Sequence, residues 1–480
     1  MPKVMYKDLR EWIKLVEGAG DLRLVEGATW QEDIGMATEL LNHAKDAPAV
    51  LFDSILGYPK GYRVLTNALL SNNRLAATFG LPSGLTKFEL STRLFEATEG
   101  KEPMPHRYVE DGPILENVIE GDAVNVLKFP APKWHEEDGG RYIGTGTYTV
   151  TKDPDEGWIN VGTYRVQVHD ETHVSFFISP GKHGRMHREK YFARKEACPV
   201  VIVPGGDPML FCAGASELPY GLCEYDWVGG VRGEPVDVIK GKYTGLPIPA
   251  RAEIALEGFA YYGDMHEEGP FGEWTGYYAS GSRDEPRITV KAIYHRNDPI
   301  ILGSPPNRPP DELAFYRSFM RSPLLKQEME RAGVPGVTAT WCHEAGGARL
   351  LLAVAINQRY PGHATQAGHI ASQCHVGAYA GRYVVVVDED IDVTDLEEVV
   401  WAMCTRSDPA NSIDIIHRAW STTLDPTLSP EQKAKGAFWN SRGIIDACRP
   451  FEWKDKYPKV NLPSPEARKK AVEKWGYLIK

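Results

Sequence analysis

The stretch HEEGPFGEWTGYY, residues 266–278, places three carboxylates around a Gly-Pro-Phe-Gly break. Glu267 and Glu268 precede the break, and Glu273 follows it. Residues five apart in a strand point to opposite faces, so a strand cannot bring Glu268 and Glu273 together. A turn at the break can. Because the neighbours are aromatic, we expect partial burial and a turn that holds two acids close to each other.

The composition of the whole chain narrows the class of protein. Its 480 residues favour two to four domains, and 42% hydrophobic with 25% charged residues is ordinary for a globular protein with a large core. The net charge of -11 argues against a nucleic-acid binder, which carries a basic stripe, but it permits an anion in a local basic pocket.

Membrane and secretion signals are missing from the sequence. No uncharged apolar run approaches the ~18 residues of a membrane helix, and the start MPKVMYKDLREW lacks the apolar stretch of a signal peptide. The seven cysteines are scattered and include no C-x-x-C. We therefore expect no membrane contact and a cytoplasmic protein with reduced thiols.

The residue pattern changes along the chain and predicts four segments. Residues 1–115 form an N-terminal α/β region that begins with a helix at 8–17, capped by Asp8, and includes a hairpin or βα corner in 50–67. Residues 116–315 hold short β-rich runs between Gly, Pro and Asp turns, typical of a barrel-like or sandwich domain, with a helix near 185–196.

The remaining chain reads as α/β and then as a helical tail. In residues 316–448, RLLLAVAIN and RYVVVVDEDI are typical of strands buried on both faces, and Thr394 with Glu397 predicts a capping box. Residues 449–480 are a Pro-rich linker and a helix that starts at Ser464 and Pro465. This helix either docks on a neighbouring subunit or packs on its own domain.

Three other stretches carry candidate chemistry. NVGTYRVQV (160–168) places Asn160 and Arg165 in a strand, SPGKHGRMH (179–187) is either a solvated turn or an anion-binding loop around Lys182, and Glu224 opens EYDWVGGVR. Asn160, a histidine and Glu224 offer mixed oxygen and nitrogen donors that suit Mn²⁺ or Mg²⁺. Spacing alone leaves coincidence open, because these residues span 64 positions.

Common nucleotide, zinc-protease and hydrolase signatures are missing. The sequence has no H-E-x-x-H, no G-x-x-x-x-G-K-[ST] and no G-x-S-x-G. The glycine-rich pieces GGDP (205–208) and HEAGGAR (343–349) match no dinucleotide fingerprint and read as turns.

The ordered series of motifs resembles the UbiD family of prenylated-FMN-dependent decarboxylases. NVGTYR, SPGKHG, CEYDWVGGVRG, EGPFGEWTGYY, NRPPDE, YPGHA, VDEDIDV and TRSDP follow one another from about residue 5 to 450. The resemblance implies an N-terminal α/β region, a central split β-barrel similar to flavin reductases, a C-terminal α/β domain, and a homodimer or homohexamer.

The resemblance also implies a cofactor site. Asn160, His183 and Glu224 match the ligands of a divalent metal, usually Mn²⁺ (Mg²⁺ is the alternative), which grips the phosphate of prenylated FMN beside K⁺; His187 competes with His183. Further residues of the cofactor lining are Val161, Gly162, Thr163, Tyr164, Arg165 and Lys182. A flavin prenyltransferase would supply the cofactor.

Arg165, Glu268 and Glu273 match the family's catalytic Glu-Arg-Glu network. Two carboxylates beside one guanidinium have their proton affinities pushed apart, and burial beside Phe271 and Trp274 keeps one of them protonated near neutral pH. Glu273 is the expected proton donor, and Glu268 is expected to pair with Arg165.

The implied activity is reversible, non-oxidative decarboxylation of an aromatic, heteroaromatic or α,β-unsaturated acid, with carboxylation at high bicarbonate. Alternatives are a flavin-binding subunit of a carboxylase complex and a conventional FMN reductase. The substrate stays open, since FWNSRGIIDACRP (438–450) differs from hydroxybenzoate-specific members. Trp439, Arg442 and Asp446 are candidates for the substrate wall or for an ordinary interdomain loop.

Overall fold

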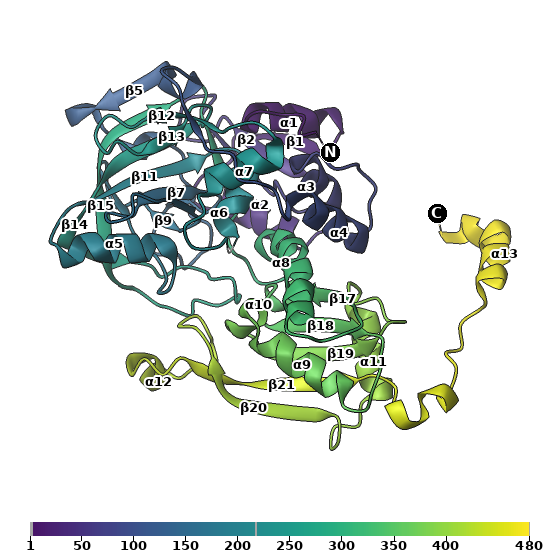
Figure 1. The fold of residues 1–480 in the computed structure, drawn as a ribbon. Helices are drawn as coiled ribbons and strands as arrows, with labels where there is room; N and C mark the ends of the chain where they lie inside the picture. The colour runs from purple at the N-terminus through teal and green to yellow at the C-terminus, as the bar shows by residue number, and fades with distance from the viewer. Residues whose placement is uncertain (1–2, 217, 480) are drawn as a thin grey trace.

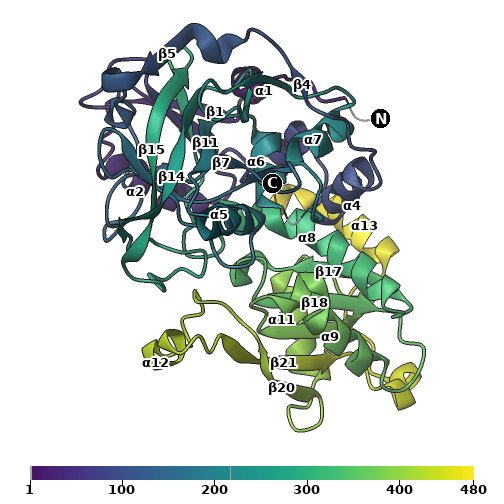
Figure 2. The same ribbon diagram turned by 60° about the vertical axis from the view of Figure 1, so that its left-hand side comes forward.

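The computed structural model describes residues 3–216 and 218–479. The N-terminal and central parts of the chain form one large body, and a smaller α/β lobe lies beneath it (Figure 1). A long helix, α8 (Glu312–Arg331), runs between the two and packs on α4 (Lys87–Thr98) and β17 (Val337–Cys342). Figure 2 shows the same arrangement from another side. The structure is therefore a mixed α/β multidomain fold, as predicted.

The N-terminal part is a four-stranded sheet with helices. The strand order is β1 (Leu22–Glu26), β2 (Ala49–Asp53), β3 (Arg63–Thr66) and β16 (Ile300–Gly303), where β16 returns from far along the chain to pair in parallel with β3. The helices besides α4 are α1 (Leu9–Gly18), α2 (Asp33–Asn42) and α3 (Asn72–Thr78). The predicted first helix is confirmed, since Asp8 caps α1. The β2–β3 hairpin confirms the predicted corner.

The central part is built on one large, mainly antiparallel sheet. Its order is β10 (His173–Ser175), β15 (Arg283–His295), β14 (Ile254–Glu268), β11 (Cys198–Gly205), β7 (Tyr148–Lys152) and β8 (Ile159–Gly162), and β5 (Asn117–Glu120) also pairs with β15. The pairing path of the described strands does not close, so the barrel part of the prediction is not confirmed.

Helices and two small sheets complete the central part. The helices are α5 (His183–Ala193), α6 (Pro208–Ala215) and α7 (Glu224–Arg232), and α5 confirms the helix expected near 185–196. One small sheet has the order β13 (Pro247–Pro249), β12 (Asp237–Lys240), β4 (Arg107–Tyr108), and the other pairs β6 (Tyr142–Gly144) with β9 (Val166–Gln167).

The C-terminal lobe is a five-stranded sheet covered by helices. The order is β17, β18 (Leu351–Ile356), β19 (Tyr383–Asp388), β21 (Trp439–Ala447) and β20 (Ile413–Trp420), and the helices are α9 (His363–Gln373), α10 (His375–Ala378), α11 (Leu396–Arg406) and α12 (Pro430–Ala434). The two predicted apolar strands, β18 and β19, pair in parallel and are almost wholly buried.

The predicted capping box of α11 is wrong by one residue. The side chain of Asp395 accepts hydrogen bonds from the amides of Glu397 and Glu398 and is the N-cap. Thr394 is held one step earlier, because its amide and hydroxyl both donate to Asp392. An Asx turn therefore uses the threonine that the sequence offered as a cap.

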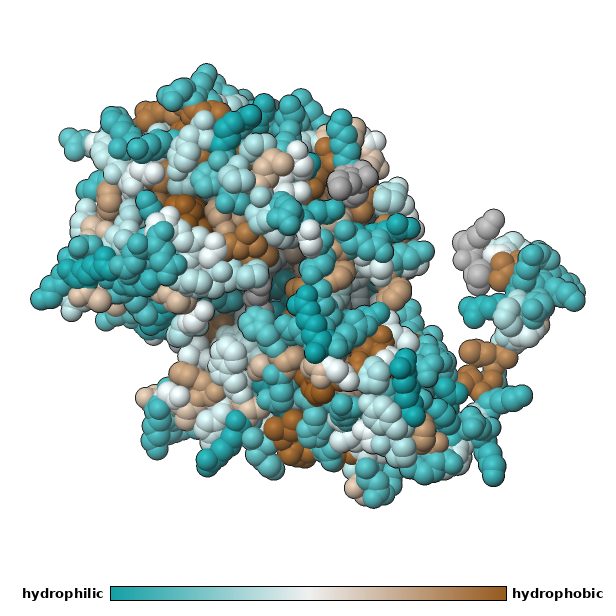
Figure 3. Space-filling view, viewed as in Figure 1, coloured by the Kyte–Doolittle hydropathy of each residue, from teal (hydrophilic) through white to brown (hydrophobic). Residues whose placement is uncertain are grey.

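The C-terminal helix α13 (Pro465–Trp475) is capped by Ser464, as predicted. None of its residues is buried. The segment stands clear of the main body, with apolar side chains showing on it (Figures 1 and 3). Short 3₁₀ turns occur at Pro113–Glu116, Gly121–Ala123, Val126–Lys128, Glu344–Gly346, Phe451–Lys456 and Gly476–Ile479.

All seven cysteines lie in the described residues and are free thiols. No helix in the described part of the chain is both long and apolar enough to cross a membrane.

Candidate active site

The loop after β14 turns sharply at the Gly-Pro-Phe-Gly break. Gly269 adopts a φ of 91°, which only glycine takes without strain. A Cβ on Gly272 would lie 2.7 Å from Nδ1 of His135, so the loop packs too closely there for a larger residue. The Gly272 amide donates to Oδ1 of Asp138 (3.0 Å), which fixes the turn from the side of residues 135–139.

This turn brings both glutamates to one arginine. Nε of Arg165 donates to Oε1 of Glu268 (2.8 Å), and its Nη2 donates to Oε2 (2.7 Å). Nη1 of Arg165 donates to Oε1 of Glu273. Glu268 is fully buried, and Glu273 is 6% exposed. The fork of one guanidinium is thus shared between two buried carboxylates, the geometry expected from the sequence.

Burial and charge act in opposite directions on these groups. Burial raises the pKa of Glu273, the Arg165 charge lowers it, and the Glu268 charge raises it again, with a net shift upward. Burial lowers the pKa of Arg165, but the negative charges of Glu273 and Glu268 raise it by more, so the guanidinium stays charged. Glu273 is therefore the carboxyl that holds a proton more readily than a free glutamate.

A tyrosine that sequence reasoning missed completes this network. The hydroxyl of Tyr142, on β6, donates to Oε1 of Glu268 (3.2 Å). Burial raises the pKa of Tyr142 far above its ordinary value, so the phenol is neutral and a donor. With Arg165 it gives Glu268 three hydrogen bonds, which hold this side chain in place. RYIGTG carries no motif that could have marked this tyrosine.

Arg165 and Glu273 open onto a cavity of about 160 Å³ with aromatic walls. The Arg165 guanidinium lies 4.2 Å from the ring of Phe177 and 5.2 Å from that of Phe271. The lining also includes the predicted cofactor residues Thr163, Tyr164 and Lys182, and, from the C-terminal half, Leu313, Arg317, Arg349, Tyr379 and Leu424. A flat aromatic molecule with a carboxylate fits these walls and this cation.

Two of the three predicted metal ligands, Asn160 and Glu224, contact each other. Nδ2 of Asn160 donates to Oε1 of Glu224 (2.9 Å), and the amide of Val161 donates to Oε2 (2.6 Å). Burial raises the pKa of Glu224 to about 8. A carboxyl buried this deeply, with no cationic partner in the described part of the chain, fits a site that receives a metal ion, whose charge would stabilise the carboxylate.

Tyr164 ties the same site to the start of α5. Its hydroxyl donates to Oδ1 of Asn160 (3.1 Å) and accepts from the amide of Gly184 (3.1 Å). A Cβ on Gly162 or on Gly184 would collide with the tyrosine ring or hydroxyl, so both glycines make this approach possible. His183, next to Gly184, faces the rings of Trp158 (4.9 Å) and Tyr220 (5.8 Å) and has no hydrogen bond to Asn160 or Glu224.

His187 lies one turn further along α5 and is fully buried. Its Nδ1 is 3.0 Å from Oγ1 of Thr151, and its Nε2 is 3.8 Å from Oδ2 of Asp153. Burial lowers its pKa to about 4, so the ring is neutral. Burial also lowers the pKa of His183, which lines a large pocket that His187 does not reach.

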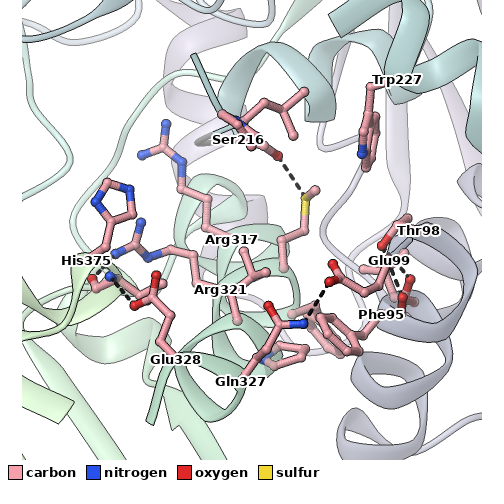
Figure 4. Close-up of a pocket in the computed structure, with 18 of the residues that line it drawn as sticks. Phe95, Thr98, Glu99, Ser216, Trp227, Arg317, Arg321, Gln327, Glu328 and His375 are labelled. Atoms are coloured by element: carbon pink, nitrogen blue, oxygen red, sulfur yellow. Dashed lines mark hydrogen bonds between the residues drawn. The ribbon is translucent and has the colours of Figure 1, made fainter. Parts of the chain in front are cut away.

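This second pocket, of about 750 Å³, lies between α4, α8 and residues 215–216 and 218–227 (Figure 4). Arg317 and Arg321 extend side by side from α8, with Ser216 and Trp227 across from them (Figure 4). Arg317, on α8, and Arg349 line both the pocket that includes His183 and the cavity that includes Arg165.

The three residues considered for the substrate wall lie elsewhere, on β21. Arg442 is buried and donates to the backbone carbonyls of Ser372, Gly377, Ala378 and Trp420. Trp439 is 40% exposed, and Asp446 accepts from the Cys448 amide. None of the three lines the cavity of Arg165. The ordinary structural alternative is the better one, although the residues form a strand rather than a loop.

A separate group of metal-type side chains, His106, Cys223 and Asp226, lies at the start of α7. Oδ1 of Asp226 accepts from both the amide and the ring of His106 (2.8 Å each). These partners satisfy one another, so the group reads as a structural cap.

The chain matches the three domains of one enzyme family. These are the N-terminal domain of 3-octaprenyl-4-hydroxybenzoate carboxy-lyase at residues 13–94, the Rift-related domain at 107–309 and the C-terminal domain at 314–447.

Individual relatives cover almost the whole chain. A pyrrole-2-carboxylic acid decarboxylase of Pseudomonas aeruginosa is 30% identical over 98% of this chain and 97% of its own. The vanillic acid decarboxylase of Sedimentibacter hydroxybenzoicus, in an open form, superposes with a TM-score of 0.84 at 30% identity over 99% of each chain. An evolved dimeric form of the UbiD-class enzyme HmfF of Pelotomaculum thermopropionicum, in complex with prenylated FMN, gives a TM-score of 0.81 at 25% identity, over 96% of this chain and 98% of its own. The chain belongs to the UbiD family of carboxy-lyases.

Proposed function

We propose that this enzyme decarboxylates an aromatic or heteroaromatic acid without net oxidation, and that it uses prenylated FMN. The observation that carries the proposal is the Arg165 guanidinium shared by two buried carboxylates at the wall of an aromatic cavity. Relatives named for pyrrole-2-carboxylic and vanillic acids, and the HmfF complex with prenylated FMN, support the substrate class and the cofactor.

The chain's own residues would bind the acid and move one proton. Arg165 attracts the substrate carboxylate and orders the two glutamates. Glu273, whose pKa burial raises, holds a proton on its carboxyl and delivers it to the carbon that loses CO₂. Glu268 keeps its three hydrogen bonds to Arg165 and Tyr142 and balances the cation. Phe177, Phe271 and Trp274 exclude water.

The cofactor would lie between the ligand residues and this network. Prenylated FMN, when bound, supplies the electron acceptor that cleavage of a carboxylate from an sp² carbon requires. Asn160, His183 and Glu224 would hold Mn²⁺ (or Mg²⁺) at its phosphate, with K⁺ nearby. Further contacts would come from Lys182 and the strand end Val161, Gly162, Thr163, Tyr164 and Arg165.

Assembly, location and domain limits complete the proposal. A homodimer or homohexamer would cover the apolar side chains of the C-terminal segment, among them Leu462, Val472 and Trp475, which are 50% to 69% exposed. A cytoplasmic enzyme loaded by a flavin prenyltransferase fits the free thiols. The divisions 1–115, 116–315, 316–448 and 449–480, and the split-barrel nature of the central sheet, remain predictions.

A substrate screen in D₂O tests the proposal. Enzyme made together with a flavin prenyltransferase is incubated with benzoates, furoates, pyrroles, indoles and cinnamates. We expect CO₂ release from one class and a single deuterium at the vacated carbon. A sample that carries the modified flavin and releases CO₂ from none of them would contradict the proposal. Carboxylation of the decarboxylated product at high bicarbonate tests the reverse direction.

A further inference from the structure

Arg283, at the start of β15, is a second guanidinium next to the network of Arg165. The register of the sheet places Arg283 directly opposite Glu268. Its guanidinium lies 4.2 Å from the ring of Phe177, the same distance at which the Arg165 guanidinium contacts that ring. One phenyl ring thus spaces two cations beside two buried carboxylates.

The hydrogen bonding of Arg283 is incomplete. Its Nε lies 3.0 Å from Oε1 of Glu285, within ion-pair distance but without the angle of a hydrogen bond. Nε and Nη2 are both buried and have no hydrogen-bond partner among the described residues. Two buried donor nitrogens without hydrogen-bond partners are costly, so a purely structural ion pair explains this geometry poorly.

Charge continues from Arg283 along β15. Glu285 is 9% exposed, and its pKa is raised by burial against the lowering charges of Arg283, Arg188 and Arg185. Burial and the Arg165 charge lower the pKa of Arg283, as expected for two guanidinium groups that contact the same ring. Arg283 and Glu285 therefore extend the charged groups around Arg165 along β15.

Arg283 acts on Glu273 through space. Its positive charge opposes the effect of burial on the Glu273 carboxyl. The other charged groups that face Glu273 are Arg165 and Glu268, and those on the shared cavity wall are Lys182, Arg317 and Arg349. At the low effective dielectric of a buried site, one more cation at this range changes the proton affinity of a carboxyl measurably.

We propose that Arg283 is a positioning residue of the decarboxylation: stacked on Phe177, it keeps Arg165 directed at Glu268 and Glu273 and limits how tightly Glu273 retains its proton. This inference rests on the proposed function, in which Glu273 is the donor. Glu285 tunes Arg283 from the far side. Without Arg283, Glu273 becomes a weaker acid, and proton delivery slows.

The test compares Arg283→Gln with Arg287→Gln. Arg287 lies four residues along the same strand, is equally exposed (28% against 29% for the side chain) and also has an acidic partner, Asp264 at 2.7 Å. Unlike Arg283, it does not stack on Phe177 and does not pair opposite Glu268 in the sheet. It therefore reports what loss of a β15 arginine does to the fold alone.

The first readout is the pH profile of kcat for the matured enzyme. The donor must be protonated, so activity is lost as pH rises through the pKa of Glu273. For Arg283→Gln we expect this limb to move up by about one pH unit and kcat to fall about tenfold, with KM within about twofold. Arg283→Lys restores most of both. Glu285→Gln, which removes an anion, moves the limb the other way.

The second readout does not need turnover. An infrared titration of the matured protein without substrate follows the carboxyl band that disappears in Glu273→Gln. The pH midpoint of this band should be higher in Arg283→Gln and should not change in Arg287→Gln. If the infrared shift occurs while no acid is decarboxylated, the proposed function fails and the coupling stands.

Two results would overturn the proposal. One is a pH profile and infrared titration in Arg283→Gln that overlay those of the unmodified enzyme. The other is an equal shift in Arg287→Gln, which would assign the effect to the strand. If Arg283→Gln does not fold, Arg283→Lys and Glu285→Gln still decide, because only electrostatic coupling predicts that Glu285→Gln lowers the limb.

Discussion

Replacing Glu273 by glutamine removes the transferable proton and keeps the size of the side chain. If Glu273 is the proton donor, kcat falls about 10²- to 10⁴-fold, the usual contribution of a general acid. KM stays within about threefold, because Arg165 still attracts the substrate carboxylate. Cofactor content is unchanged, since Glu273 is not among the Asn160 and Glu224 contacts.

The structure also sets the cost of this change to stability. Arg165 keeps its two hydrogen bonds to Glu268, at 2.8 and 2.7 Å, so its charge stays paired. Only one charge-assisted hydrogen bond is lost, and the free energy of unfolding should fall by about 2 kcal/mol or less. Arg165→Met, in contrast, leaves two buried carboxylates without their cation and should cost about 3 to 5 kcal/mol.

The assay combines rapid-quench single turnover with denaturant unfolding. Glu267→Gln is the matched control, because Glu267 precedes Glu268 on β14, is exposed and makes no contact with Arg165. We expect control activity within about twofold of the unmodified enzyme. A Glu273→Gln enzyme that keeps a tenth or more of its turnover, or one that loses its flavin, would refute the assigned role.

Three further predictions concern the ligand site and the C-terminal sheet. The raised pKa of Glu224, about 8 against an ordinary 4.5, means that folded, metal-free protein keeps a proton that the unfolded chain releases. Its unfolding free energy should therefore fall by about 3 to 5 kcal/mol as pH rises from about 5 to 8; Glu224→Gln or added Mn²⁺ should flatten this slope, and an unchanged slope in Glu224→Gln would contradict the assignment. His183→Ala should weaken Mn²⁺ binding at least about tenfold by calorimetry and His187→Ala less than that, whereas the reverse order would make His187 the ligand. Arg442→Met should destabilise the protein by about 3 to 5 kcal/mol in urea, because it removes the hydrogen bonds from a buried guanidinium to four backbone carbonyls, of which that of Trp420 still accepts from the Ala380 amide; a change in KM without loss of stability would instead place Arg442 at the substrate.

Local patterns predicted the elements whose determinants are local. The face of α1 and its Asp8 cap, the buried strands β18 and β19, and the Ser464 cap of α13 all follow from residues within one or two turns. The prediction for the N-cap of α11 was wrong for a local reason too. Two adjacent residues could serve, and the Asx turn at Asp392 engaged Thr394.

Pairing between distant segments could not be read from the sequence. The central sheet inserts β11 between β14 and β7, and the N-terminal sheet takes in β16 from residue 300 onward. These choices depend on tertiary packing of strands that look alike. Whether the central sheet closes into a barrel also depends on this tertiary packing, so the sequence could not show it.

The candidate site shows the same division. Motif residues Arg165, Glu268 and Glu273 were predicted as a group, and the structure brings them together. Tyr142 and Arg283 were missed because a tyrosine or an arginine in a β-rich run has no distinctive neighbours. Arg442 was a candidate for the substrate wall, because the sequence does not distinguish a buried arginine that binds carbonyls from an arginine that faces a ligand.

The central claim is that decarboxylation requires both prenylated FMN and the network of Arg165, Glu268 and Glu273. Comparing turnover with prenylated and with ordinary FMN tests this claim most directly. Enzyme from cells with and without a flavin prenyltransferase is compared on one responsive acid, at equal flavin content. The account predicts CO₂ release only from the protein that carries prenylated FMN. Equal CO₂ release from protein that carries ordinary FMN, or reduction of that FMN by NAD(P)H as the main activity, would contradict it.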